Sequence, residues 1–389
     1  MPVSRRGSDV DEIAPTTIEE ASGTLRSLSS DSVPVRFLGG GTKSHWGGAA
    51  PEPDVVVRTT SLAGVVEHNA GDLTAVVLAG TPLIDAQKAF GAAGQMLAID
   101  PPESTRATIG GAIATADSGP MRYRYGAPRD LVLGITAVMS DGAVARSGGK
   151  VIKNVAGYDL GKLFCGAWGT LGMIARVALR LHPRPPAMVT AVGRSEDPFA
   201  IQAAAGELAH GGLEPMAIDV AWSGGVGRVL ARFGGAAAGG QARRAADVLS
   251  AVRTDVDIVD ADEELWSRQR AGQRSETGVV VRLSVLPTEI AEVLRCADAA
   301  AGSVAGRAVG LVWVTLPPAA PLDAVAAVEE LRSALAPRVC TVLDAPIEVR
   351  AKLDVWGAEL DGRMDLMRRL KQQFDPAGIC NPGIFMGGI

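Results

Sequence analysis

Short apolar stretches, separated by glycine, proline and polar residues, run through the first half of the chain. The predicted strands are 33–38, 54–58, 73–79, 131–140, 143–146 and 174–181. Between two of them lie Asp141 and Gly142, a pair that predicts a tight hairpin. In 176–181 apolar and polar positions alternate, which indicates a strand with one buried and one solvated face. With a helix expected near 18–28, the pattern predicts a strand-rich first part.

The chain changes character at a proline cluster, 182–186, which we take as a domain boundary. Beyond it, strand-like and helix-like runs alternate up to about residue 345. The predicted helices are 198–209, 240–252, 287–301 and 322–335. The order approximates two successive β-α-β-β-α-β units, so it predicts an antiparallel sheet with helices over one face.

The last residues of the chain are predicted to return to the first part. A helix near 363–374 is followed by the sequence DPAGICNPG, in which prolines and glycines fix the backbone. The expected fold class is therefore α+β, with three parts that span 1–185, 186–345 and 346–389.

Composition and charge narrow the possible functions. The net charge of -5 provides no broad basic field, so a nucleic-acid partner is not expected. The charge-free runs are shorter than the roughly 18–20 residues of a membrane span. The N-terminus does not resemble a signal peptide. The four cysteines lie far apart, which argues against a local zinc or iron–sulfur site, so we expect a cytoplasmic, reduced protein without a metal.

A glycine-rich loop at 39–44, GGGTKS, directly follows a predicted strand. Bare backbone N–H groups in such a loop can reach an anion, so the loop is a candidate phosphate cradle. A simple glycine-rich hairpin turn would have the same composition. The loop is not a Walker A motif, because the residue before Lys43 is threonine and the following HWGGAAPEP cannot begin the required helix.

Two further stretches are rich in small residues. ATIGGAIATADSG at 107–119 offers a surface without bulk, against which a flat, extended ligand could lie. The cluster 122–125, RYRY, follows it and could contact a ligand or form solvated charges on a loop. The segment 148–174 holds seven glycines in an otherwise apolar run. Glycine at that density costs backbone entropy, so it indicates a backbone that passes close to a ligand or another chain segment.

Taken together and in order, these motifs resemble a known family. The loop GGGTKS, the segment ATIGGAIATADSG, the block KNVAGYDLGKLFCGAWGTLGMI and the terminal FDPAGICNPG are similar to vanillyl-alcohol-oxidase-type (PCMH-type) FAD proteins. AGQMLAIDPP and VIKNVAGYDL are particularly similar to the FAD-binding E subunits of bacterial glycolate oxidase, a three-subunit glycolate dehydrogenase. The resemblance implies a split PCMH-type FAD-binding domain with an inserted α+β cap domain.

The resemblance also implies which residues hold FAD. The pyrophosphate would be held by Gly39, Gly40, Gly41, Thr42, Lys43 and Ser44. The ribityl chain and the flavin ring would lie along Pro101, Thr108, Gly110, Gly111, Thr115, Ser118 and Gly119. The adenine end would contact Gly169, Gly172 and Ile174, and Asn381 from the returning tail would lie near the flavin. Tyr158 and Asp159 are expected to brace the turn within the segment 148–174.

Two departures from the family pattern limit the prediction. The position that would align with a flavin-linked histidine is glycine or threonine, and His45 lies beyond it, so we expect non-covalent FAD. Relatives that oxidise hydroxy acids carry a His-x-His metal motif in the cap, whereas only His210 falls there in this chain. No catalytic base is evident; Arg122, Arg124, Lys153 and Tyr158 could each hold a carboxylate or have a structural role.

Three functional hypotheses follow. The chain is the FAD-binding subunit of a glycolate (2-hydroxy acid) dehydrogenase complex, with a sister FAD-containing catalytic subunit and an iron–sulfur subunit as partners. Alternatively, it is a self-sufficient FAD-dependent dehydrogenase for another alcohol or hydroxy acid, or a mainly structural subunit. In the first case we expect a cytoplasmic protein that meets the membrane only peripherally, through its partners.

Overall fold

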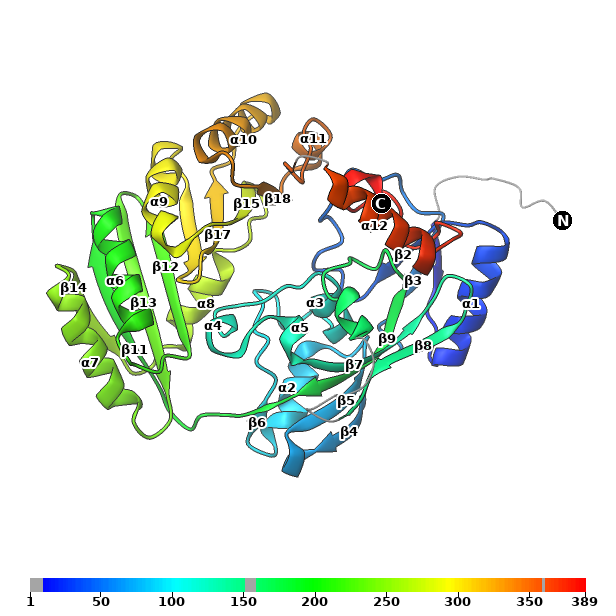
Figure 1. Cartoon of the computed structure of the whole chain (residues 1–389), viewed down its shortest axis with the longest axis horizontal. Coiled ribbons are helices and arrows are strands. Elements are labelled where there is room, and N and C mark those ends of the chain that lie inside the picture. Colours follow the sequence, from blue (N-terminus) through cyan, green and yellow to red (C-terminus); the bar gives the residue numbers. More distant parts are fainter. Residues whose placement is uncertain (1–9, 151–158, 359–360) are drawn as a thin grey trace.

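Two small sheets form the first half of the computed structural model, which describes residues 10–150, 159–358 and 361–389 (Figure 1). In the first sheet, β2 (Val35–Leu38) and β3 (Val55–Arg58) run parallel, and β1 (Asp11–Ile13) lies on the other side of β3. The end of β2 leads directly into the glycine-rich loop, so this sheet positions the loop.

The second sheet is antiparallel and has five strands. Their order is β4 (Val65–Asn69), β5 (Thr74–Leu78), β9 (Met173–Arg180), β7 (Val132–Val138) and β8 (Val144–Gly148). The predicted hairpin is confirmed, since β7 pairs with β8 and the Asp141 carboxylate accepts from the Ala143 N–H at 2.8 Å. A further two-stranded ladder joins β6 (Gln95–Met96) to β10 (His182–Pro183).

Short helices connect these strands. They are α1 (Ile18–Ser30), α2 (Leu83–Gly91), α3 (Ile109–Ala114), α4 (Arg122–Tyr125), α5 (Pro128–Leu131) and the 3-10 turns η1 (Ala70–Asp72) and η2 (Leu160–Leu163). The basic-aromatic cluster, expected as a loop, is the single helical turn α4. The predicted α1 is confirmed, and its Thr17 side chain caps the first turn by accepting from the Glu20 N–H.

The second half of the chain forms one eight-stranded antiparallel sheet, which we call the cap sheet. Its order is β14 (Asp255–Val259), β11 (Met188–Ser195), β13 (Val226–Gly234), β12 (Ala217–Ser223), β16 (Ser303–Arg307), β17 (Leu311–Leu316), β15 (Val279–Ser284) and β18 (Cys340–Asp344). The predicted antiparallel sheet and the doubled β-α-β-β-α-β order are thus confirmed.

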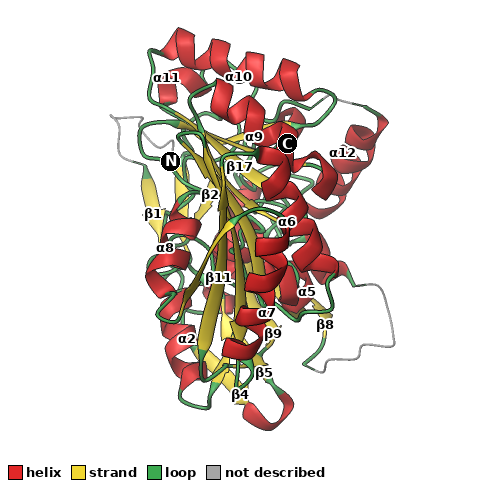
Figure 2. Ribbon diagram, turned by 90° about the vertical axis from the view of Figure 1, so that its left-hand side faces the viewer, coloured by secondary structure: helices red, strands yellow, loops and turns green. Residues whose placement is uncertain are grey.

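Helices cover the two faces of the cap sheet unequally. One face packs on α6 (Pro198–His210), α7 (Ala238–Ala251), α9 (Ile290–Ala299) and α10 (Pro321–Leu335) around one large core. The other face carries α8 (Glu263–Ala271) (Figure 2). Trp266 of this helix is fully buried against Ala217 and Leu230. The sequence did not indicate α8. It lies between the cap sheet and the first half of the chain (Figure 1).

The C-terminal segment lies against the first sheet. After η3 (Pro287–Glu289) in the cap and α11 (Ile347–Arg350), helix α12 (Gly362–Phe374) leads to Cys380, which bridges to Val35 of β2 in parallel (Figure 1). The chain ends in the turn η4 (Met386–Gly388). The structure confirms an α+β fold, whereas the division into 1–185, 186–345 and 346–389 stays a prediction. Among the described helices, none is long and apolar enough to cross a membrane.

Asp375 fastens the returning segment, and its replacement tests this. The side chain of Asp375 is buried, and it accepts from the N–H groups of Ile379 and Cys380 at 3.2 and 2.8 Å and from Lys371 Nζ at 2.6 Å. We expect Asp375→Asn to lower the free energy of unfolding by about 3 kcal/mol, because the partly buried Lys371 loses its counter-charge. Denaturant titration measures this. Asp365→Asn, an exposed carboxylate on the same helix, should change it by less than about 0.5 kcal/mol, and equal effects would contradict the assignment.

Candidate functional site

The glycine-rich loop, helix α3, the start of β9 and the C-terminal tail meet at one cleft of about 890 Å³, which we call the glycine cleft. All but three of the residues predicted to hold the cofactor line it. They are Gly39, Gly40, Gly41, Thr42, Lys43, Ser44, Thr108, Gly110, Gly111, Thr115, Gly169, Gly172, Ile174 and Asn381. Residues separated by more than 300 positions in the sequence therefore form one site.

Three predicted residues lie outside the lining of this cleft. Pro101 is buried and does not line the cleft. Gly119 packs so tightly that a Cβ atom would lie 1.8 Å from the Asp100 carbonyl oxygen, so the glycine serves a chain contact. Ser118 lines a different, neighbouring cavity. Lys153 and Tyr158 fall outside the described residues.

The backbone of the loop 39–44 is prepared for an anion. The N–H groups of residues 39–43 donate no hydrogen bond to any atom of the described residues. Gly41 adopts a φ of 71°, a left-handed conformation that lets successive N–H groups converge. Arg36 also lines the cleft, and its buried Nε has no hydrogen-bond partner in the described part of the chain. Burial lowers the pKa of Arg36, so an anion beside it would be favourable. These features fit a pyrophosphate.

Lys43 does not offer a free charge to the cleft. Its Nζ lies 3.0 Å from the Asp117 carboxylate, and both side chains are almost fully buried. Nζ also lies 5.8 Å from the centre of the Trp46 ring. The lysine therefore ties the loop to the segment after α3, while the backbone faces the cleft.

The glycines of the cleft have two different tasks. A Cβ on Gly40 would lie 1.7 Å from the Arg106 carbonyl oxygen, and one on Gly110 would lie 2.7 Å from the Ala79 Cβ, so both glycines permit chain-to-chain packing. A Cβ on Gly111 would approach only the Thr108 hydroxyl, at 3.1 Å. That hydroxyl caps α3 by accepting from the Gly111 N–H. Of these three, Gly111 is the one whose missing side chain leaves space for a ligand.

The tail residue Asn381 closes the cleft from the C-terminal side. Its Oδ1 accepts from the Phe37 N–H at 2.8 Å, and its Nδ2 donates to the Trp168 carbonyl at 2.6 Å. Both amide atoms are thus used within the protein. Asn381 and Trp168 both have positive φ, of 44° and 55°. Strained backbone persists where packing fixes it, and here it shapes the wall of the cleft.

Sequence reasoning missed several residues that line the cleft. They are Arg36, Phe37, Leu38, Trp46, Thr59, Ala79, Ala114, Trp168, Met173 and Ile384. Trp46 and Trp168 lie 5.9 Å apart, and Trp168 continues to Trp356 at 5.1 Å. The sequence contained one signal for the tryptophans. Aromatic residues make up only 4% of the chain, yet Trp46 lies just after the 39–44 loop and Trp168 directly precedes Gly169.

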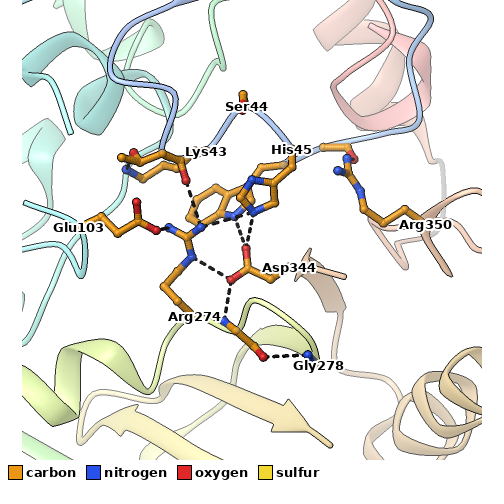
Figure 3. A network of polar contacts seen from close by, with 12 residues as sticks. Lys43, Ser44, His45, Glu103, Arg274, Gly278, Asp344 and Arg350 are labelled. Carbon is orange, nitrogen blue, oxygen red and sulfur yellow. Dashed lines mark hydrogen bonds and ion pairs between the residues drawn. The ribbon is translucent and has the colours of Figure 1, made fainter. Parts of the chain in front are cut away.

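A buried carboxylate, Asp344 at the end of β18, fixes the loop to the cap sheet (Figure 3). Its Oδ1 lies 2.8 Å from His45 Nε2 and accepts from Trp46 Nε1 at 2.7 Å. Its Oδ2 accepts from Arg274 Nε at 2.8 Å and from the Ser275 N–H at 3.0 Å. We call this set the Asp344 network.

The Asp344 network reaches both sides of the cleft. Arg274 also donates to the Thr42 carbonyl at 3.0 Å and pairs with Glu103 at 3.0 Å (Figure 3). Burial alone would raise the pKa of Asp344, but the hydrogen bond from His45 and the charge of Arg274 outweigh it and lower the pKa to about 2. His45 is therefore engaged by Asp344. Non-covalent attachment of the flavin remains a prediction.

A second cavity, which we call the cap cavity, adjoins the glycine cleft. Trp46 lines both, and residues 114 and 115 of the cleft continue into 116–118 of the cavity. The opposite wall is the face of the cap sheet formed by β15, β17 and β18. Arg122, which the sequence offered as a candidate, lines this cavity, whereas Arg124 is exposed and pairs with Glu214 at 3.5 Å. None of its described lining residues is a histidine.

Comparison with known protein families agrees with this geometry. Residues 12–148 match the model described as FAD binding domain, and residues 350–384 match FAD linked oxidases, C-terminal domain. The chain thus contains segments similar to an FAD binding domain and to the C-terminal domain of FAD linked oxidases. The two matched segments are the ones that the structure brings together around the glycine cleft. The predictions of FAD as cofactor and of an oxidoreductase are confirmed.

Individual relatives refine the picture. The chain is 36% identical over 191 residues to glycolate oxidase subunit GlcE of Escherichia coli, covering 49% of this chain and 53% of that one. Glycolate oxidase subunit GlcD of Bacillus subtilis is 34% identical, over 48% of this chain and 39% of its own. The chain thus spans about half or less of the length of these relatives. An uncharacterized FAD-linked oxidoreductase of Mycobacterium tuberculosis is 26% identical over 96% of this chain and 90% of its own.

A solved structure shares the fold. Alkyldihydroxyacetonephosphate synthase aligns with a TM-score of 0.73 over 95% of this chain and 76% of its own, at 16% identity. At that identity the likeness extends to the fold alone. It supports the predicted PCMH-type architecture with a cap.

The lowered pKa of Asp344 predicts that the free energy of unfolding decreases at acidic pH. Because the folded pKa of Asp344 is lowered from 3.8 to about 2, its stabilisation is present above about pH 4 and is lost as the pH falls toward 2. The loss should amount to about 2 kcal/mol. Asp344→Asn should remove this part of the pH dependence in denaturant titrations. The control is Asp247→Asn, at an exposed carboxylate. If the free energy of unfolding of Asp344→Asn still decreases below about pH 4 as in the wild type, the assignment is contradicted.

Proposed function

We propose that this chain binds FAD in the glycine cleft and serves as the FAD-binding subunit of a multi-subunit glycolate (2-hydroxy acid) dehydrogenase. The observation that supports the cofactor site most directly is the run of backbone N–H groups at 39–43 without partners in the described structure, beside the unpaired Nε of Arg36. When bound, FAD supplies the acceptor for the two electrons of alcohol oxidation.

The residues of the chain have distinct roles in this proposal. The 39–44 loop binds the pyrophosphate through its N–H groups, and Gly111 leaves space for the body of the cofactor. Trp46 and Trp168 exclude water from the cleft. The Lys43–Asp117 pair and the Asp344 network hold the loop in place from outside. FAD is held without a covalent bond, and the three parts 1–185, 186–345 and 346–389 form the split FAD domain and its cap.

The proposal includes a sister FAD-containing catalytic subunit and an iron–sulfur subunit. Two relatives are named as subunits of glycolate oxidase, which supports membership of a complex. No group of three or more potential metal-ligating side chains occurs within the described residues, so the onward electron path would need a partner. Any contact with the membrane would come through these partners, and the chain itself would be cytoplasmic.

A second function is favoured by one specific observation. The cap cavity adjoins the glycine cleft and presents two arginines, which suits a substrate that this chain oxidises itself. In that case the chain is a self-sufficient FAD-dependent dehydrogenase. A mainly structural subunit is the remaining alternative, and it requires a chain that holds no flavin.

The cofactor site is tested by filling the space at Gly111. We expect Gly111→Leu to lose at least nine-tenths of the bound FAD, because the side chain enters the cleft without striking the backbone. Flavin absorbance per protein measures the loss. Gly23→Leu, at an exposed helical glycine with no atom near its Cβ, should keep wild-type flavin content. If Gly111→Leu retains its flavin, the site assignment is wrong. Gly40 is a poorer test, since its replacement disturbs the contact with Arg106.

Membership of a complex is tested by reduction of the flavin. The chain is purified alone and with its sister subunits, and glycolate and larger 2-hydroxy acids are added without oxygen. Bleaching of the flavin only in the assembled complex supports the subunit proposal. Bleaching in the isolated chain supports the self-sufficient dehydrogenase instead. A stable complex in which this chain holds no flavin supports the structural role.

A further inference from the structure

One buried guanidinium group joins the cap sheet to the first half of the chain. Arg307, in β16, is fully buried, and its Nη1 donates to the equally buried Asp219 carboxylate of β12 at 2.7 Å. Its Nη2 donates to the Ser118 carbonyl, in the segment after α3, at 3.4 Å. The side-chain amide of buried Gln273, which follows α8, lies between the same carbonyl and Arg307. The cap therefore holds the backbone of this segment through Arg307.

A second carboxylate, Asp100, holds the same segment from within the first half of the chain. Its Oδ1 and Oδ2 accept from the Met121 N–H at 3.2 and 3.4 Å. A Cβ atom on Gly119 would lie 2.5 Å from Asp100 Oδ1, so this carboxylate packs directly against the backbone. Segment 118–121 thus connects a carboxylate of the first half to a guanidinium group of the cap.

The cations around these two carboxylates do not supply one direct partner for each. Arg307 bonds the carboxylate of its own sheet. The next cation, Arg270 on α8, pairs with Glu263 at 2.6 Å. Arg122 on α4 acts on Arg307 only at longer range. Among the residues that the structure describes, Asp100 forms no ion pair, and its hydrogen bonds come from one backbone N–H.

Burial outweighs the attraction of the neighbouring cations at both carboxylates. It raises the pKa of Asp100 to about 7, although the charges of Arg307 and Arg270 lower this pKa; the charge of Asp219 raises it further. Burial also raises the pKa of Asp219 to about 6, against the charge of Arg307 and the hydrogen bond from Gln269. Asp100, the carboxylate without an ion-pair partner, is therefore the first to take up a proton as the pH falls.

We propose that the contact of the cap with segment 118–121 depends on a proton: it is closed while Asp100 is protonated and loosens when Asp100 is ionised. In the closed contact an ionised Asp100 lacks an ion-pair partner and is repelled by Asp219, so it gains hydration when the cap moves away. A protonated Asp100 carries no such cost. Because residues 116–118 line the cap cavity and 114–115 line the glycine cleft, this contact lies beside both cavities.

The direction of the pH dependence follows from the raised pKa of Asp100. In water its pKa is 3.8, whereas in the closed contact it is about 7. The stabilisation of the closed contact is therefore complete below about pH 4 and is lost as the pH rises through 7. Between pH 6 and pH 8 the ratio of closed to open molecules should fall about tenfold. The stabilisation by Asp344 is lost in the opposite direction, toward pH 2, so the two effects are separable.

Amide hydrogen exchange of the full chain between pH 6 and pH 8 tests the proposal. Mass spectrometry follows one peptide on each side of the contact, 118–122 and 271–275, with rates corrected for intrinsic exchange at each pH. We expect the opening equilibrium of both peptides to rise about tenfold over this range. Unchanged opening in the wild type would overturn the proposal. A rise confined to 118–122 would overturn the part played by the cap.

Substitution of Asp100 assigns the proton. Asp100→Asn keeps the side chain neutral at every pH, so it should remove the rise in both peptides. Asp85→Asn, at an exposed carboxylate on α2, is the matched control and should keep the rise. A full rise in Asp100→Asn would show that another group binds the proton, and it would overturn the proposal.

Substitution of Asp219 tests whether the two carboxylates compete for one guanidinium group. Asp219→Asn removes the negative charge next to Arg307 and leaves this cation to Asp100, so the midpoint of the pH dependence should move at least one pH unit lower. An unchanged midpoint would contradict the shared cation and overturn the proposal. If a variant does not fold, the wild-type series still decides. The exchange measurement does not use the flavin, so its outcome is independent of the proposed function.

Discussion

The Asp344 carboxylate is the interaction on which the arrangement of the site depends. It accepts hydrogen bonds from Trp46, Arg274 and the Ser275 N–H and lies against His45, so its charge is well compensated within the protein. Because Asp344 ends β18, whereas His45 and Trp46 directly follow the glycine-rich loop, one buried group joins the cap sheet to the wall of the cleft. A buried carboxylate with several hydrogen-bond donors has few alternative arrangements, so it fixes the relative positions of the segments that it connects.

Two further sets of contacts connect the segments around the cleft. At one end, Asp375 and Lys371 fix the returning tail, so that Asn381 reaches β2 and the Trp168 loop. In the middle, the aromatic rings of Trp46, Trp168 and Trp356 form a continuous contact between loop, cleft and tail. Ion pairs of Asp344 and Asp375 and the packing of the tryptophan rings therefore connect walls of the cleft that come from distant parts of the chain.

Charge is distributed unequally over the two cavities. In the glycine cleft, Lys43 is neutralised by Asp117, and unpaired backbone N–H groups with Arg36 remain to face an anion. In the cap cavity the one carboxylate among the described lining residues is the same Asp117, and two arginines, Arg122 and Arg282, also line it. The Lys43–Asp117 pair therefore stands between the cavities and leaves each with a positive surface. Such a pair of adjoining anion sites suits a negatively charged cofactor beside a negatively charged substrate.

Much of the fold could be predicted from local patterns. The doubled β-α-β-β-α-β order, the hairpin at Asp141 and Gly142 and most residues of the glycine cleft follow from periodicity, turn residues and motif resemblance. Helix α8 was missed, because its sequence, EELWSRQRA, is strongly polar and only Trp266 marks its buried side. The helical turn at 122–125 is too short to show a period.

The glycine-rich stretch 148–174 also separates what the sequence predicts from what the tertiary structure adds, although 151–158 lie outside the described residues. Its sequence indicated a backbone in close contact with something, and the structure identifies one such contact as the Asn381 side chain against Gly169. The sequence by itself determined the class of fold, the order of elements and the motifs that line the glycine cleft, since these depend on residues near one another in the chain. Only the tertiary structure decided that Gly40 serves packing while Gly111 leaves space, and that Asp344 joins loop to cap. It also decided that Arg122 and Arg282 share a cavity, because these relations depend on distances between segments that sequence spacing does not contain.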